Sequence, residues 1–317
     1  MAAHKQDLLE AAIGLMALMG EQGLSVAPGS ALQRAHDVLR AWAAGIRPAG
    51  QPDFGAFVSA LEVGELAVRI LRLREPVPGM RGALADLARA STAAESQRSD
   101  PNDVWSHRLL ELRIALAALS FAKDVELDEP DVKFRNVDRT TSCLVACKVP
   151  HGQPGRPTPA TLTANIVKGI SQIRRAALGR RSPEVFGLVV LSQRNHMSHD
   201  LFMPPLADAE RVRNLSHDEV MAQLSADTDR MRELLTEESP HGGSIAEDVT
   251  AELVSLGNDD GILAGVAFLQ GSTFIKDGRL SPVRRLWSPW PLDDQLLERL
   301  NGGLQYPSTP RAAALEP

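Results

Sequence analysis

The chain has 317 residues, of which 44% are hydrophobic, 23% are charged and only 4% are aromatic. This composition is typical of a globular protein with one or two buried cores. The net charge of −6 argues against a protein that coats nucleic acid without specificity, because such proteins are usually basic. The few aromatic rings argue against binding of single strands by base stacking.

Neither a targeting signal nor a disulfide is predicted. Asp7 and Glu10 interrupt the apolar N-terminal stretch, whereas a secretory signal has an uninterrupted one, and no segment is long and apolar enough for a membrane helix. The two cysteines, Cys143 and Cys147, stand four apart in one apolar run. On a strand they would share a face but lie too far apart to bridge, so we expect reduced, buried thiols. Together these features predict a soluble, cytoplasmic protein with no membrane partner.

The first hundred residues are predicted to be helical. Ser30 and Gln33 match a capping box at the start of one helix, and Asp53 is predicted to cap the next. A shorter helix is expected around Met80–Arg89. Apolar residues recur at helical spacing, at Leu32, Ala35, Leu39 and Trp42 and again at Phe57, Leu61, Val68 and Leu71. Such apolar faces pack within one domain or mediate assembly of a homo-oligomer, and the sequence leaves both readings open.

A polar segment, residues 91–102, separates this region from the rest of the chain. We therefore divide the chain into a helical N-terminal region (1–100), an α/β domain (101–300) and a loose C-terminal tail rich in proline and alanine (301–317).

Strand-like and helical patterns alternate after the linker. A strongly apolar helix is predicted over 104–121. The predicted strands are 124–127, 131–135, 142–149, 185–192, 262–270 and, at a sheet edge, 281–290; the later helices are 162–178, 208–238 and 245–256. This order is typical of an α/β sheet flanked by helices.

A short motif crosses these strands. Pro130-Asp131 begins one strand, and Lys148 follows near the end of the next, in the run LVACKV. Over residues 109–192 this pattern resembles the PD-(D/E)XK nuclease superfamily. The resemblance implies a restriction-endonuclease-like fold, a mixed central sheet flanked by helices, here preceded by an all-α N-terminal region. Glu111 on the preceding helix and Gln172 on the following helix match positions where many or some family members carry an acid and a glutamine.

One position departs from the family. An acid is expected two residues before Lys148, where this chain has Ala146. The following helix contains no acid that could replace it, and Glu111 is a better candidate than Glu126 or Asp128.

The resemblance implies metal-dependent hydrolysis of nucleic acid with Mg²⁺ or Mn²⁺. Asp131 would ligate the ion, and Glu111 would support it directly or through water. Lys148 would act on the attacking water or stabilise developing charge, and Gln172 would position the water or the substrate. Because Ala146 supplies no ligand, the chemistry is open: either an active nuclease, or a degenerate member that binds nucleic acid or proteins without cleaving.

Each of these residues also has an ordinary structural reading. Asp131 could simply begin a strand, Lys148 could be a solvated strand end, and Glu111 could pair with Arg108 or His107. Only the combination, in this order and spacing, favours the family.

Two further groups stand out. A basic cluster on the helix after Lys148 is predicted to contact nucleic-acid phosphates, although a solvated helix face is an equal alternative; it comprises Lys168, Arg174 and Arg175, with Arg180 and Arg181 after them. His196 and His199 near Asp200 suggest zinc, but no further ligand stands at suitable spacing, which favours a polar loop.

Overall fold

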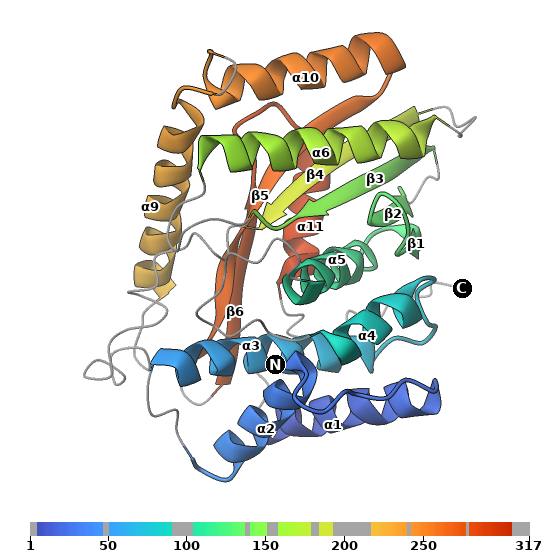
Figure 1. Ribbon diagram of the computed structural model, residues 1–317, viewed down its shortest axis with the longest axis vertical. Helices are drawn as coiled ribbons and strands as arrows, with labels where there is room; N and C mark the ends of the chain where they lie inside the picture. The colour runs from blue at the N-terminus through green and yellow to red at the C-terminus, as the bar shows by residue number, and fades with distance from the viewer. Residues whose placement is uncertain are drawn as a thin grey trace, which may run out of the picture.

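The computed structural model describes residues 5–46, 51–90, 104–136, 140–150, 158–178, 184–192, 217–239, 242–276 and 279–305. A six-stranded sheet with its strands in chain order lies at the centre (Figure 1). The strands are β1 (Lys123–Glu126), β2 (Val132–Arg135), β3 (Thr141–Lys148), β4 (Glu184–Ser192), β5 (Leu263–Lys276) and β6 (Arg279–Trp287). β3, β4 and β5 run parallel, and the other neighbours are antiparallel. The mixed sheet confirms the predicted α/β class.

Two apolar clusters cover the two faces of this sheet. Along β3, Cys143, Val145 and Cys147 point into one cluster, and Leu144 and Ala146 point into the other, as expected from strand alternation. The first cluster contains α5 (Val104–Ala118) and α11 (Asp294–Leu304), and we refer to this side as the α5 face. The second contains α6 (Pro159–Ala177), α9 (His217–Leu235) and α10 (Ile245–Asp260), and this side is the α6 face.

Helix α6 makes the crossover between the parallel strands β3 and β4. Thr158 caps its first turn by accepting a hydrogen bond from the backbone N–H of Thr161. Gly169 lets the helix approach β4 closely, because a Cβ atom there would lie 2.7 Å from a methyl group of Val189. Helix α6 thus packs closely along β3 and β4 (Figure 1).

The N-terminal region forms four helices, α1 (Lys5–Glu21), α2 (Ala31–Ala43), α3 (Gln51–Ile70) and α4 (Met80–Arg89). Their apolar residues belong to the same core cluster as the α5 face of the sheet. A buried ion pair joins α3 to β6, with the guanidinium of Arg284 donating to both carboxylate oxygens of Glu65 at 2.8 and 2.6 Å. The helices therefore pack on the sheet through a shared core. The segment chosen as the domain boundary, 91–102, lies outside the described residues, so the division into domains remains a prediction.

The outer edge of β6 is covered by α11. The side chain of Asn301 accepts a hydrogen bond from the backbone N–H of Leu286 at 2.6 Å and donates one to its carbonyl at 2.9 Å. The Gln305 amide donates to the carbonyl of Arg284 at 2.7 Å. These side chains take the place of a further strand along this part of β6.

Several sequence expectations can be compared directly. Ser30 caps α2 as predicted, by accepting from the backbone N–H of Gln33, and both cysteines are buried, free thiols. Asp53 is not a cap, because α3 begins at Gln51. Helix α11 was not predicted, and it extends beyond residue 301, where the loose tail was expected to begin. Within the described residues, no helix combines the length and the hydropathy needed to cross a membrane.

Candidate functional site

The predicted residues Glu111, Asp131 and Lys148 come together at the end of β3. Asp131 precedes β2, and Lys148 is the last residue of β3. Oδ2 of Asp131 accepts hydrogen bonds from the backbone N–H of Cys147 at 2.6 Å and from Nζ of Lys148 at 3.2 Å. Nζ of Lys148 also donates to the carbonyl of Cys147 at 2.9 Å. Lys148 is therefore a buried, hydrogen-bonded residue and not a solvated strand end.

The sheet register explains why Asp131 meets this strand end. β2 runs antiparallel to β3, with Val132 opposite Val145. The residue before Val132 consequently lies beside Ala146 and Cys147, where its carboxylate can take the Cys147 N–H. The Pro-Asp pair thus lies immediately before β2, whereas the motif placed it at the first residues of the strand.

Glu111 approaches the same cluster from α5. Its side chain is only 6% exposed, and Oε2 is bound by the guanidinium of Arg108 one turn earlier. Burial, and secondarily the nearby Asp131 carboxylate, raise the pKa of Glu111 to about 7, although Arg108 and Lys148 oppose this shift. Because the Asp131 carboxylate and the Lys148 ammonium both shift the pKa of Glu111, the three groups lie within electrostatic range of one another.

Asp131 is also difficult to ionise. Burial raises its pKa above the ordinary value, while Lys148 and the Cys147 N–H act in the opposite direction. The cluster therefore contains two carboxyl groups that repel each other when both are ionised, and a single ammonium close to them.

Arg108 is itself held by Asp86 of α4. Nη2 and Nε of Arg108 lie 2.8 and 2.9 Å from Oδ2 of Asp86. The sequence indicates Arg108 only as a helical neighbour of Glu111, and it gives no sign of Asp86. No local pattern could have indicated Asp86, since it reaches the site from the N-terminal helices.

The substitution at Ala146 has a clear structural setting. Ala146 is fully buried in the α6-face cluster, together with Leu162, Ile166 and Val189. An acid at this position would project into apolar side chains. The site therefore lacks this ligand, and its surroundings are shaped around a methyl group.

We asked whether the remaining residues fit a metal ion. Within the described part of the chain, no group of three or more His, Cys, Asp or Glu residues is arranged to hold one. Mg²⁺ and Mn²⁺, however, are bound by oxygen ligands, and Mg²⁺ often uses only one or two carboxylates besides water and phosphate. Oδ1 of Asp131 and Oε1 of Glu111 take no part in the contacts described above. Carboxylate oxygens are the donors that a hard divalent cation prefers, so the chemistry of this pair is compatible with such an ion.

The residues predicted on α6 are only partly near this cluster. Arg174 is turned toward α10, where its Nε lies 2.6 Å from Asp260, which does not support a phosphate contact. Arg175 instead points to the turn before Asp131, with a nitrogen 3.4 Å from a carboxylate oxygen of Glu129. Gln172 is partly buried, and its Oε1 has no hydrogen-bond partner within the described residues. Arg180, Arg181, His196, His199 and Asp200 lie outside those residues.

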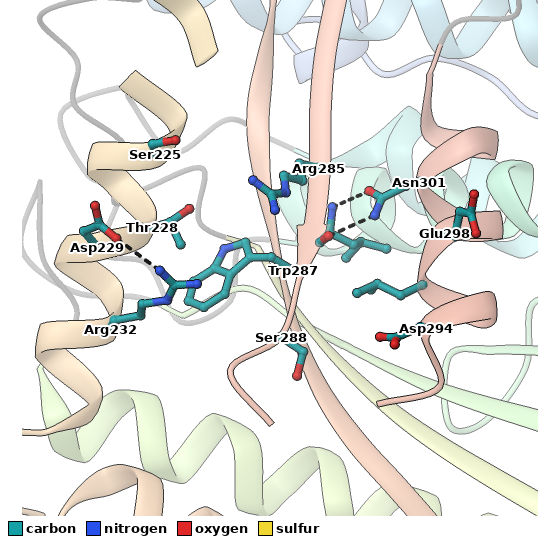
Figure 2. Close-up of a pocket in the computed structure, with 12 residues that line it drawn as sticks. Ser225, Thr228, Asp229, Arg232, Arg285, Trp287, Ser288, Asp294, Glu298 and Asn301 are labelled. Atoms are coloured by element: carbon teal, nitrogen blue, oxygen red, sulfur yellow. Dashed lines mark hydrogen bonds and ion pairs between the residues drawn. The ribbon is translucent and has the colours of Figure 1, made fainter. Parts of the chain in front are cut away.

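A separate hollow of about 610 Å³ lies between α9, β6 and α11 (Figure 2). In Figure 2, Arg232 lies over the ring of Trp287, with its guanidinium carbon 5.6 Å from the ring centroid, and it pairs with Asp229 at 3.2 Å. Trp287 also stacks on Phe268 with ring centroids 5.0 Å apart, and it is nearly buried. The ring is therefore already packed by its neighbours and offers little surface for a ligand. The hollow shares no residue with the Asp131 cluster.

Comparisons with protein-family models, with curated proteins and with solved structures found no match.

Proposed function

We propose that this chain is a PD-(D/E)XK-type protein that hydrolyses phosphodiester bonds in nucleic acid. The observation that carries the proposal is the contact of Asp131 with Lys148 at the end of β3, with Glu111 of α5 within electrostatic range of both. The element order from α5 to β4, with β2 antiparallel and β4 parallel to β3, agrees with the restriction-endonuclease-like fold that the motif implies.

In this proposal Asp131 and Glu111 hold a Mg²⁺ or Mn²⁺ ion. The ion would supply an activated water and stabilise negative charge on the phosphate. Lys148 keeps Asp131 oriented through its hydrogen bond, and its ammonium lies where negative charge would develop. Arg108 holds Glu111 in place, and Gln172 would orient the substrate or the water.

The test is cleavage of plasmid DNA, single-stranded DNA and RNA with Mg²⁺, Mn²⁺ or EDTA. The purified chain is compared with Asp131→Asn, Glu111→Gln and Lys148→Met, and with Asp229→Asn as a control at an exposed ion pair. We expect metal-dependent cleavage that falls by about 100-fold or more in the site variants, the scale on which loss of one preorganised charged group slows catalysis. Equal cleavage by all variants would indicate a contaminating nuclease.

A second candidate function is binding of nucleic acid without cleavage. It is favoured by Ala146, whose apolar surroundings leave the site one acid short, and by the hydrogen bond that already ties Asp131 to Lys148. No cleavage of any substrate by a folded protein, together with binding to DNA or RNA in EDTA, would support this candidate over the first.

A further inference from the structure

The turn that leads into Asp131 is bound by three basic residues from three different elements. Asp128 pairs with Lys133 of β2, Glu129 pairs with Arg175 of α6 at 3.4 Å, and Asp131 pairs with Lys148 of β3 at 3.2 Å. Only the last of these pairs belongs to the proposed catalytic cluster. The other two place carboxylates of the turn against basic groups beside that cluster.

These basic groups share the α6 face of the sheet. Lys133 lies opposite Leu144 in the β2–β3 ladder, and Leu144 belongs to the α6-face cluster; residues directly opposite each other in an antiparallel pair share a face. On α6, Lys168, Gln172 and Arg175 follow one another at helical spacing and form one stripe. The contact between Arg175 and Glu129 shows that this stripe faces the turn. Lys168 has no ion-pair partner within the described residues.

The acidic partners of the two outer pairs are exposed, with 65% of the Asp128 side chain and 55% of the Glu129 side chain accessible. The Glu129–Arg175 pair is exposed on both sides, and such pairs contribute little to stability. Lys133, in contrast, has a buried stem and presents only its ammonium to Asp128. Rotation of the two acidic side chains would release the Lys133 ammonium and the Arg175 guanidinium from these ion pairs.

We propose that Lys133, Lys168 and Arg175 bind backbone phosphates of nucleic acid, and that Asp128 and Glu129 compete with those phosphates as built-in anions. Arg175 suits a phosphate because its guanidinium can donate two parallel hydrogen bonds. The proposal builds on the proposed function, since it places the substrate backbone beside Asp131. The sequence predicts phosphate contacts from Lys168, Arg174 and Arg175. Because Arg174 pairs with Asp260 of α10, this proposal leaves it out and adds Lys133.

Binding is measured in EDTA, so that cleavage plays no part, as fluorescence anisotropy of a labelled DNA duplex with increasing salt. The variant Asp128→Asn/Glu129→Gln is compared with Asp37→Asn/Asp229→Asn, which changes net charge equally at two other exposed ion pairs. We expect the first variant to bind at least about threefold more tightly than the control at low salt. Its plot of log affinity against log salt should be steeper by about 0.9 for each phosphate gained.

A second comparison tests the basic side of the surface. Adding Lys168→Gln and Arg175→Gln to Asp128→Asn/Glu129→Gln should remove the gain, whereas adding Arg40→Gln and Arg232→Gln should leave it intact. Equal affinity in the two acid-neutralised double variants, or a gain that survives loss of Lys168 and Arg175, would overturn the proposal. If neutralising the two acids tightens DNA binding but the native chain cleaves no substrate, the phosphate-binding surface is supported and the proposed nuclease function is not. If the native chain cleaves DNA but neutralising the acids does not tighten binding, the nuclease function is supported and this surface is not.

Discussion

Burial strongly changes the ionisation of Glu111 on folding. Its pKa in the fold, about 7, lies above the ordinary value of 4.5. The folded state therefore holds the proton more tightly, so stability from this group is full below pH 4.5 and is lost as the pH rises to about 7. The proposed metal binding would need the ionised carboxylate, so the proposed nuclease activity should rise between pH 6 and 8.

We predict that Glu111→Gln removes this pH dependence of stability. Because glutamine cannot ionise, the free energy of unfolding of the variant should improve relative to the native chain by about 2 to 3 kcal/mol between pH 5 and pH 8. Urea unfolding at both pH values measures the difference, and Glu298→Gln on the exposed side of α11 is the control. If the free energies of unfolding of the native and Glu111→Gln chains differ by the same amount at both pH values, the raised pKa is contradicted.

Ala146 gives a second residue-scale prediction. Ala146→Glu would bury a carboxyl group among apolar side chains, and we expect it to lower stability by about 3 kcal/mol or more. Leu178→Glu, at a side chain that is 74% exposed, should have little effect. If Ala146→Glu folds normally and gains metal-dependent cleavage, the position is a vacant ligand site and not part of the core.

At this scale the sequence was informative where the motif is local. Pro130-Asp131 and Lys148 are placed by strand order and register, so their meeting could be anticipated from spacing. The electrostatic environment of the site could not be anticipated from the sequence. Asp86 of α4 contacts the site through Arg108, and the carboxylates of the turn pair with residues of β2 and α6. Such contacts depend on how distant elements pack.

Between elements, the buried pair of Glu65 and Arg284 joins α3 to β6. Removing one partner leaves the other charge buried, which typically costs about 3 to 5 kcal/mol. We therefore expect Glu65→Leu and Arg284→Met each to lower the free energy of unfolding strongly, and the double variant to be less destabilised than the sum of the two. Chemical denaturation gives the three values. Additive losses would mean that the two side chains do not act as a pair.

Helical and strand periodicity identified the strands of the sheet and most of the helices, but not α11. Its last turn contains Asn301, Gly302 and Gly303, a run that is typical of a loop. Gly303 is explained by packing, since a Cβ atom there would lie 2.2 Å from the carbonyl oxygen of Ala117 on α5. The glycine that obscured the helix in the sequence is what lets it pack closely.

For the whole molecule, the continuous core on the α5 face has a thermodynamic consequence. The N-terminal helices and α5 bury the same apolar cluster, so neither part is complete without the other. We predict one cooperative thermal transition for the full chain, and a fragment of residues 101–317 that fails to fold and exposes apolar surface. Calorimetry and dye binding test this. Two transitions, or a well-folded fragment, would support the division into domains made from the linker composition.

The covered edge of β6 limits how copies of this chain can associate. An edge strand normally offers its backbone groups to a strand from another molecule, the route by which sheets polymerise. Here Asn301 occupies both outward groups of Leu286, and Gln305 occupies the carbonyl of Arg284. The opposite edge, β1, is only four residues long. An oligomer of this protein should therefore be built from contacts between helices, and not from a sheet continued across copies through this part of β6.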